Sequence, residues 1–314
     1  MKSAPGTLTI ATRRLIRVLV GAGKARSAQA NAAILADIDV DAALISAAKN
    51  GLDDLVKLAL CCGANQEARD RDENKTTALM RAAGKGCGGP ALMALITRGV
   101  DLDARDQFGR TALMWAAYEG RPEAVRVLLS AGANSHLKDN REQTALMLAM
   151  VGFAPRVIKT FIAEILATGS ALHERDEAGQ TALMQAIASS NVAAARLLID
   201  RGADVNAQDV IGMTALALLA FKIPSEATTE CLVLLIDCGA DPTIVDEEGR
   251  TVLDVLDDCH ATELVAALDS ALVNHGPQRT KLLATLSPSR RLTLLPKSCT
   301  AEAATTLSSW RRPP

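Results

Sequence analysis

Residues 106–134 read DQFGRTALMWAAYEGRPEAVRVLLSAGAN, and this stretch decides the fold. Thr111 stands where a helix N-cap is expected, because its hydroxyl can accept a hydrogen bond from a backbone N–H of the first helical turn. A second apolar stripe at helical spacing follows and stops at Gly132, a residue that tolerates the left-handed backbone of a helix end. The stretch therefore predicts two short helices joined by a loop, preceded by a turn over Asp106–Gly109.

The same pattern recurs along the chain at a nearly constant spacing. Thr-Ala-Leu-Met occurs four times, two variants follow it, and the leucines of this series, with one earlier copy, stand 33 to 37 residues apart. A glycine ends each second helix, and from that glycine to the next leucine is 14 residues in five of six cases. The leucines are Leu44, Leu79, Leu113, Leu146, Leu183, Leu216 and Leu253, and the glycines are Gly63, Gly99, Gly132, Gly169, Gly202 and Gly239. Repeats of this length predict a stack of seven similar helix pairs.

Residues 106–134 and the fragment GADVNA at 202–207 resemble the ankyrin repeat pattern, and the resemblance covers residues 41–268, the last repeat serving as a C-terminal cap. It implies an all-α solenoid of helix-turn-helix units joined by β-hairpin-like fingers. The usual Thr-Pro-Leu-His of the family is Thr-Ala-Leu-Met here. The polar link that the histidine makes between fingers is thus replaced by methionine packing, which leaves the stiffness of the fingers open.

Three places depart from the regular repeat. The fourth repeat is longer by four residues, and its apolar stripe predicts a second helix that starts earlier, near Pro155. The sixth is also longer, and residues 222–225 predict an extended loop between its helices. The glycine-rich segment 84–90 predicts a flexible connection in the second repeat.

Charge divides the chain into three parts. The net charge is −2, and because residues 1–40 carry +4 and residues 274–314 carry +6, residues 41–273 carry −12. We expect a repeat domain at 41–273 between a basic N-terminal segment, either a degenerate capping repeat or a targeting segment, and a basic, disordered tail at 274–314. An acidic repeat domain favours a protein partner with a basic surface and argues against nucleic acid on the repeats.

No catalytic or metal-binding pattern is found. The seven cysteines are irregularly spaced without any Cys-x-x-Cys, which favours buried, reduced thiols in a cytoplasmic protein, and Cys61 and Cys62 are expected to be partly buried. His136 and His173 occupy equivalent places in adjacent repeats, but stacked helices about 8–10 Å apart hold two imidazoles too far apart to share one ion. The acidic cluster around Asp254 suits the polar outer face of a terminal repeat. We therefore expect no enzyme, no catalytic residue, no metal and no cofactor.

The third repeat concentrates aromatic residues. Three of the seven aromatic residues of the chain fall within eleven positions there. Contacts in the family typically come from the fingertips and the exposed side of the first helix, and Trp, Tyr and Arg are enriched at binding hot spots. The resemblance therefore places partner-binding residues at Gln107, Phe108, Arg110, Trp115, Tyr118 and Glu119.

The sixth repeat adds Val210, Ile211 and Met213 on its finger and Phe221 on its first helix, all expected to be exposed apolar side chains. The alternative is that Trp115 and Phe221 pack against the next repeat. If the cluster binds a partner, alanine at Trp115 and Tyr118 is expected to abolish capture and to leave thermal stability nearly unchanged.

These observations favour a non-enzymatic adaptor or scaffold that binds a protein partner on the concave face formed by the fingers and first helices. The alternative is a membrane-surface or organelle-targeted regulator, anchored by its basic ends and recruiting partners through the repeats. Vesicle binding by residues 1–40 would separate the two. The charge of the tail also suggests that it folds back on the acidic domain and masks the binding face.

Overall fold

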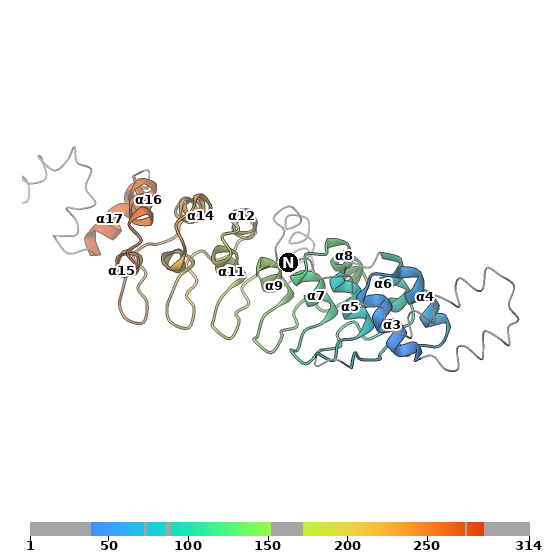
Figure 1. Ribbon diagram of the computed structural model, residues 1–314. Helices are drawn as coiled ribbons and strands as arrows, with labels where there is room; N and C mark the ends of the chain where they lie inside the picture. Colours follow the sequence, from blue (N-terminus) through green and yellow to red (C-terminus); the bar gives the residue numbers. More distant parts are fainter. Residues whose placement is uncertain (1–38, 72–73, 86–88, 152–171, 274, 286–314) are drawn as a thin grey trace, which may run out of the picture. The chain divides into compact units, whose positions relative to one another are not determined.

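The computed structural model describes residues 39–71, 74–85, 89–151, 172–273 and 275–285. The chain forms two compact units that divide between Asp204 and Val205. Repeats one to five lie in the N-terminal unit, and repeats six and seven in the C-terminal unit. In each unit the loops that precede the first helices, here called fingers, project from one side of the helix pairs (Figure 1).

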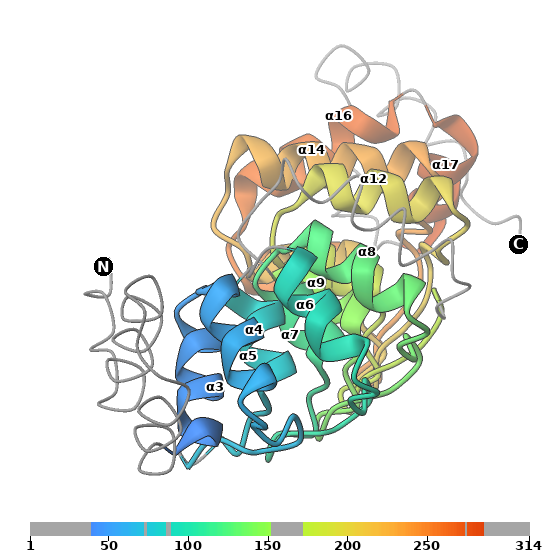
Figure 2. The ribbon, with the colours of Figure 1, turned by 90° about the vertical axis from the view of Figure 1, so that its right-hand side faces the viewer.

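The N-terminal unit is built from two rows of short helices (Figure 2). The first helices α3, α5, α7, α9 and α11 each contact the next one in this order, and the second helices α4, α6 and α8 do the same. The helices are α3 (Val40–Lys49), α4 (Asp53–Cys61), α5 (Ala78–Lys85), α6 (Gly89–Ile96), α7 (Ala112–Tyr118), α8 (Pro122–Ser130), α9 (Ala145–Val151), α11 (Ala182–Ala188) and α12 (Val192–Asp200).

The C-terminal unit repeats this arrangement over two pairs and adds one helix. Contacts join α13 to α15, α14 to α16, and α16 to α17. The elements are α13 (Ala215–Leu218), the 3-10 turn η1 (Leu219–Phe221), α14 (Glu226–Asp237), α15 (Val252–Asp258), α16 (Thr262–Leu272) and α17 (Gly276–Thr285). The all-α repeat fold is confirmed, and in the described residues the extended segments are isolated bridges such as Arg69–Thr77.

The helix α17 corrects one expectation. Residues 274–314 were expected to be disordered, but Gly276–Thr285 is helical and packs against α16. Leu282 is buried, and His275 Nε2 lies 2.9 Å from Asp237 Oδ1 at the start of the helix. Leu282, Leu283 and Ala284 are consecutive in the sequence and not spaced at a helical period, so the sequence did not predict this helix.

The capping pattern of the repeats is as predicted. The Thr111 hydroxyl accepts from the Met114 backbone N–H at 3.3 Å, and the equivalent threonines of repeats two, four, five and six do the same. In repeat seven, Thr251 instead donates its hydroxyl to Asp254 at 2.7 Å. Gly63, Gly132 and the other described glycines of this series have positive φ angles after their second helices, whereas Gly169 lies outside the described residues.

Small and flexible side chains fill the core between the helices. The paired alanines of the first helices, such as Ala116 and Ala117, are fully buried and allow close approach of neighbouring helices. Met80, Met114 and Met184 are equally buried, which confirms the packing expected of methionine at the position of the family histidine.

The three irregular segments have different outcomes. Residues 222–225 form the predicted extended loop, and Ser225 then caps α14. The segment 84–90 is a connection only in part, because α5 continues to Lys85 and α6 begins at Gly89. Pro155 and the basic segment 1–38 lie outside the described residues.

Candidate functional site

An aspartate, buried in three of five cases, organises the turn of the fingers of repeats three to seven. Asp106 Oδ1 accepts the backbone N–H groups of Phe108 and Arg110, both at 2.9 Å. Gly109 has a φ angle of 75°, and a Cβ there would lie 2.5 Å from Oδ1 of Asn140 in the next finger. The turn therefore requires both the carboxylate and the glycine. The same pair of carboxylate bonds is made by Asp139, Asp176, Asp209 and Asp246.

Long polar side chains link successive fingers of the N-terminal unit. Arg69 donates to the carbonyl of Arg105 at 2.7 Å, and Arg105 donates to that of Lys138 at 3.0 Å. Lys138 continues the series to the carbonyl of Arg175 at 2.9 Å. Each link joins equivalent positions of adjacent repeats.

A second set of links joins the fingertips mainly through backbone N–H groups. The N–H of Asn140 donates to the carbonyl of Phe108 at 2.9 Å. In the C-terminal unit, the N–H of Glu247 donates to the carbonyl of Ile211 at 3.1 Å, and Gln208 donates to the carbonyl of Val245. These bonds hold neighbouring fingertips side by side, so the fingers keep polar links where the family histidine is missing.

Trp115 joins the third finger to its helix. Its indole Nε1 donates to Asp106 Oδ2 at 2.9 Å, and its ring lies 3.4 Å from the point where a Cβ on Gly84 would stand. The side chain is therefore half-buried against the preceding repeat. Trp115 therefore has a structural role as well as an exposed part. The alternative placed it against the next repeat, whereas its ring packs against Gly84 of the preceding one.

Arg110 occupies the centre of the aromatic cluster. Its guanidinium carbon lies 5.4 Å from the ring centre of Tyr118 and 5.9 Å from that of Phe108, within the range of a cation–π contact. Its Nε lies 3.6 Å from Oδ2 of Asp139, a buried carboxylate of the next finger. Two rings and one carboxylate thus hold Arg110 in place, and the Phe108 ring stays 44% exposed.

Gln107 and Glu119 lie at the edges of this cluster. Gln107 is exposed, and its side-chain amide donates to Asn74 Oδ1 of the preceding finger at 3.1 Å. Glu119 is exposed at the C-cap of α7, and its Cγ lies 3.6 Å from the Cβ point of Gly84. The predicted residues of the third repeat therefore form one surface, here called the Arg110 cluster: Gln107, Phe108, Arg110, Trp115, Tyr118 and Glu119.

The sixth repeat presents apolar side chains, with one correction. Val210, Ile211 and Phe221 are 57%, 55% and 61% exposed, as expected. Met213 was expected to be exposed, but it is 1% exposed. An apolar side chain at this position is stabilised by burial, whereas Arg110, at the same position of the third repeat, is partly exposed beside two rings and the Asp139 carboxylate.

Two further exposed apolar residues of the C-terminal unit were not predicted as contacts. Ile223 is exposed in the loop between the helices of repeat six, and Val245 is exposed on the seventh finger. The only sign of their exposure in the sequence was that both are aliphatic residues in segments without helical spacing.

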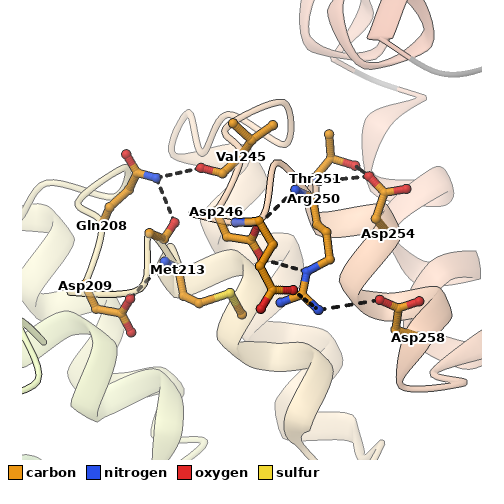
Figure 3. A network of polar contacts seen from close by, with 11 residues as sticks. Gln208, Asp209, Met213, Val245, Asp246, Arg250, Thr251, Asp254 and Asp258 are labelled. Carbon is orange, nitrogen blue, oxygen red and sulfur yellow. Dashed lines mark hydrogen bonds and ion pairs between the residues drawn. The ribbon is translucent and has the colours of Figure 1, made fainter.

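A charged network organises the seventh finger (Figure 3). Arg250 Nε donates to Asp246 Oδ2 at 2.9 Å, and its Nη1 lies 3.0 Å from Glu248 and 3.7 Å from Asp258. Burial alone would raise the pKa of Asp246, but the backbone and guanidinium hydrogen bonds from Arg250 hold that pKa below its usual value. Part of the predicted acidic cluster is thus arranged around one arginine.

The cysteines are less buried than expected. Cys231 is buried, and desolvation with the nearby charge of Glu230 raises its pKa to about 11. Cys61, Cys238 and Cys259 are exposed because they lie at helix ends, where the chain turns toward solvent.

Burial, followed by the charge of Cys61, raises the pKa of the half-buried Cys62. A raised pKa is the opposite of what an activated thiolate needs.

The described ranges contain neither a candidate metal site nor a candidate membrane span. Within them, no group of three or more His, Cys, Asp or Glu side chains could hold a metal ion, and His136 and His173 are exposed. Among the helices that the structure describes, none combines the length and apolarity needed to cross a bilayer.

A family model described as ankyrin repeats (3 copies) matches the chain in four overlapping stretches, 44–139, 88–160, 131–209 and 154–246. These matches together cover more than half of the sequence. The chain belongs to the ankyrin repeat family. The fold and the family expected from the sequence are therefore confirmed, and the Arg110 cluster lies on an ankyrin finger and its first helix.

Individual relatives match over shorter distances. An L-asparaginase of Dirofilaria immitis is 32% identical over 164 residues, which are 52% of this chain and 26% of the relative. A probable palmitoyltransferase AKR2 of Saccharomyces uvarum is 49% identical over 59 residues, 19% of this chain and 8% of the relative. The human neurogenic locus notch homolog protein 1 is 42% identical over 79 residues, 25% of this chain and 3% of the relative. The chain thus spans about a quarter or less of these proteins.

Proposed function

We propose that the chain is a non-enzymatic adaptor or scaffold, and that the Arg110 cluster is its main contact with a protein partner. Ankyrin repeats are generally protein–protein interaction modules and are typically non-enzymatic. The observation that carries the proposal is the arrangement of Arg110 between the Phe108 and Tyr118 rings, at 5.9 and 5.4 Å. The exposed side chains of Val210, Ile211 and Phe221 form a separate, second contact in the C-terminal unit.

The side chains of the Arg110 cluster are already held in place, and this supports a role in binding. Binding usually costs about 0.5–1.5 kcal/mol for each side chain that must be immobilised. Arg110 is already held by Asp139, and Trp115 is held by Asp106. Arginine, tyrosine and tryptophan are also the residue types that dominate binding energies in interfaces.

Charge supports a partner with a basic surface. Residues 41–273 carry −12, and Glu119, Glu142 and Glu177 are exposed on or beside the fingers of the N-terminal unit. Such a field accelerates association with a basic protein and repels nucleic acid. The gain in association rate should fall steeply with added salt.

Quantitative affinity capture tests the proposal. The full chain carries Phe108→Ala, an exposed ring of the cluster, and the control carries Met93→Ser on α6, whose side chain is 46% exposed, close to the 44% of Phe108. Proteins bound by the parent chain should fall at least about tenfold with Phe108→Ala and stay unchanged with Met93→Ser. Equal recovery with both variants would reject the Arg110 cluster as the binding site.

A cytoplasmic location is part of the proposal, and the membrane-surface regulator remains the alternative. The alternative is supported by the +4 of residues 1–40 and the +6 of residues 274–314. Vesicles with about 30% anionic lipid should leave the full chain in solution if the adaptor proposal holds. Salt-sensitive sedimentation of the chain with such vesicles would favour the regulator.

A further inference from the structure

The sixth and seventh fingertips form a surface that combines exposed aliphatic and acidic side chains. The Glu247 N–H donates to the Ile211 carbonyl at 3.1 Å, so the two tips lie side by side. Val210, Ile211, Glu247 and Glu248 are all exposed. These four residues are called here the C-terminal fingertip surface.

The seventh finger and the helix α15 that follows it carry a strong negative charge. Residues 246–258 carry −5, with Arg250 as their only basic residue. That arginine is already shared among Asp246, Glu248 and Asp258. Glu247 has no ion pair within the part of the chain that the structure describes. An occupant of this surface should therefore combine aliphatic side chains with at least one positive charge.

The chain itself contains such a segment. Residues 290–297 read RRLTLLPK, with two arginines followed by three leucines and a lysine. The last described residue of α17 is Thr285, and from there the five residues to Arg290 can span up to about 17 Å and the ten to Leu295 up to about 34 Å. Neighbouring repeats stack roughly 10 Å apart, so a tail leaving α17 can pass the seventh finger and reach the sixth.

The order of residues in the tail matches the order of the fingers. Arg290 and Arg291 come first and would meet the acidic seventh fingertip. Leu292 to Leu295 come next and would meet Val210 and Ile211 on the sixth. A tether of this length holds the segment at an effective concentration on the order of millimolar, so even a weak contact is populated.

We propose that residues 290–297 bind in cis to the C-terminal fingertip surface and cover the second partner contact of the proposed function. The inference rests on that function only for its consequence, which is autoinhibition. The contact itself needs no partner, so its failure and the failure of the adaptor proposal can be told apart.

Site-specific photo-cross-linking in the full chain tests the contact. A benzophenone amino acid at Ile211 should cross-link within one chain to residues 290–297, as mapped by mass spectrometry. The matched control places the same amino acid at Ala178, the equivalent tip position of the fifth finger. The cross-link at Ile211 should fall at least about fivefold with Arg290→Glu and Arg291→Glu, and also in about 1 M salt.

A charge exchange makes the test specific. Glu247→Lys should weaken the cross-link, and combining it with Arg290→Glu and Arg291→Glu should restore it. Glu230→Lys on α14 carries the same charge change on an exposed helix position and should have no effect. The proposal is overturned if Ile211 cross-links to residues 290–297 no more than Ala178 does, if the product joins two chains, or if charge reversal leaves it unchanged.

Discussion

The third and sixth repeats make the same turn and cap hydrogen bonds but carry different kinds of side chain at equivalent positions. In both, an aspartate accepts the N–H groups two and four residues ahead, and a threonine caps the first helix. At the three positions where the third repeat has Arg110, Trp115 and Tyr118, the sixth has Met213, Leu218 and Phe221. The arginine, the indole and the phenol of the cluster are thus each replaced by an apolar side chain.

This replacement changes how each surface is held. Trp115 and Arg110 are fixed by carboxylates of their own and the next finger, whereas Leu218 and Phe221 can make no such bond. The third repeat therefore offers an ordered surface whose residues also stabilise the array. In the sixth repeat Met213 is buried, but Val210, Ile211 and Phe221 are exposed apolar side chains that contribute little to the fold and are available for a partner to cover.

The largest expected difference concerns stability. Trp115→Ala removes a half-buried indole and leaves Asp106 Oδ2 without its donor, so the free energy of unfolding should fall by about 3 kcal/mol. Phe221→Ala, seven residues beyond the capping threonine of the sixth repeat, should change it by about 0.5 kcal/mol or less. Urea unfolding followed by circular dichroism measures both.

This revises the expectation that alanine at Trp115 and Tyr118 leaves stability nearly unchanged. Because Trp115 has a structural role, its loss would reduce binding even if the indole never touched a partner. Equal stability of Trp115→Ala and Phe221→Ala would break the distinction between the two repeats.

A smaller difference should separate the two finger aspartates. Asparagine in place of Asp106 keeps the oxygen that accepts the Phe108 and Arg110 N–H groups but loses acceptance from Trp115. Asparagine in place of Asp209 loses nothing comparable, because Leu218 stands at the tryptophan position. Asp106→Asn should therefore destabilise the chain by about 1–2 kcal/mol more than Asp209→Asn, measured by the same unfolding curves. A difference near zero would mean that the indole bond contributes little.

The contact between Asp246 and Arg250 in the seventh finger should affect the pH at which the chain unfolds in acid. The pKa of Asp246 is lowered in the fold, so its stabilisation is present above its ordinary pKa, near 4, and is lost as the pH falls through the lower folded value. Arg250→Gln removes the guanidinium bonds and lets that pKa rise. The acid-unfolding midpoint should then move to higher pH by a few tenths of a unit, followed by circular dichroism. Arg196→Gln, on an exposed position of α12, is the control and should not move it.

The sequence was sufficient for features that depend on neighbouring residues. The cap of Thr111 on Met114 spans three residues, and the turn at Asp106 spans four, so propensity and spacing predicted both. The bond from Trp115 to Asp106 joins a helix to a finger, and that from Arg69 to the carbonyl of Arg105 spans 36 residues. These bonds depend on the distance between stacked elements, which periodicity alone does not give. Met213 was wrongly placed for the same reason, since burial there depends on the packing beneath the finger.

The smallest effect on stability is expected at the fingertip of the sixth repeat. Val210→Ser and Ile211→Ser remove exposed aliphatic surface and leave the backbone N–H of Ile211 bonded to Asp209, so unfolding should change by about 0.5 kcal/mol or less. Val233→Ser on α14, also exposed, is the matched control for loss of surface hydrophobicity.

The same fingertip pair should nevertheless alter association measurably. If the aliphatic tips form the second contact, Val210→Ser with Ile211→Ser should weaken partner binding several-fold while Val233→Ser leaves it unchanged, as measured by calorimetry with the captured partner. Loss of binding without loss of stability would then be confined to the sixth repeat, whereas at Trp115 the two losses come together. If the serine pair instead destabilises the chain as much as Trp115→Ala, the tips are part of the packed array, and the contrast between the repeats fails.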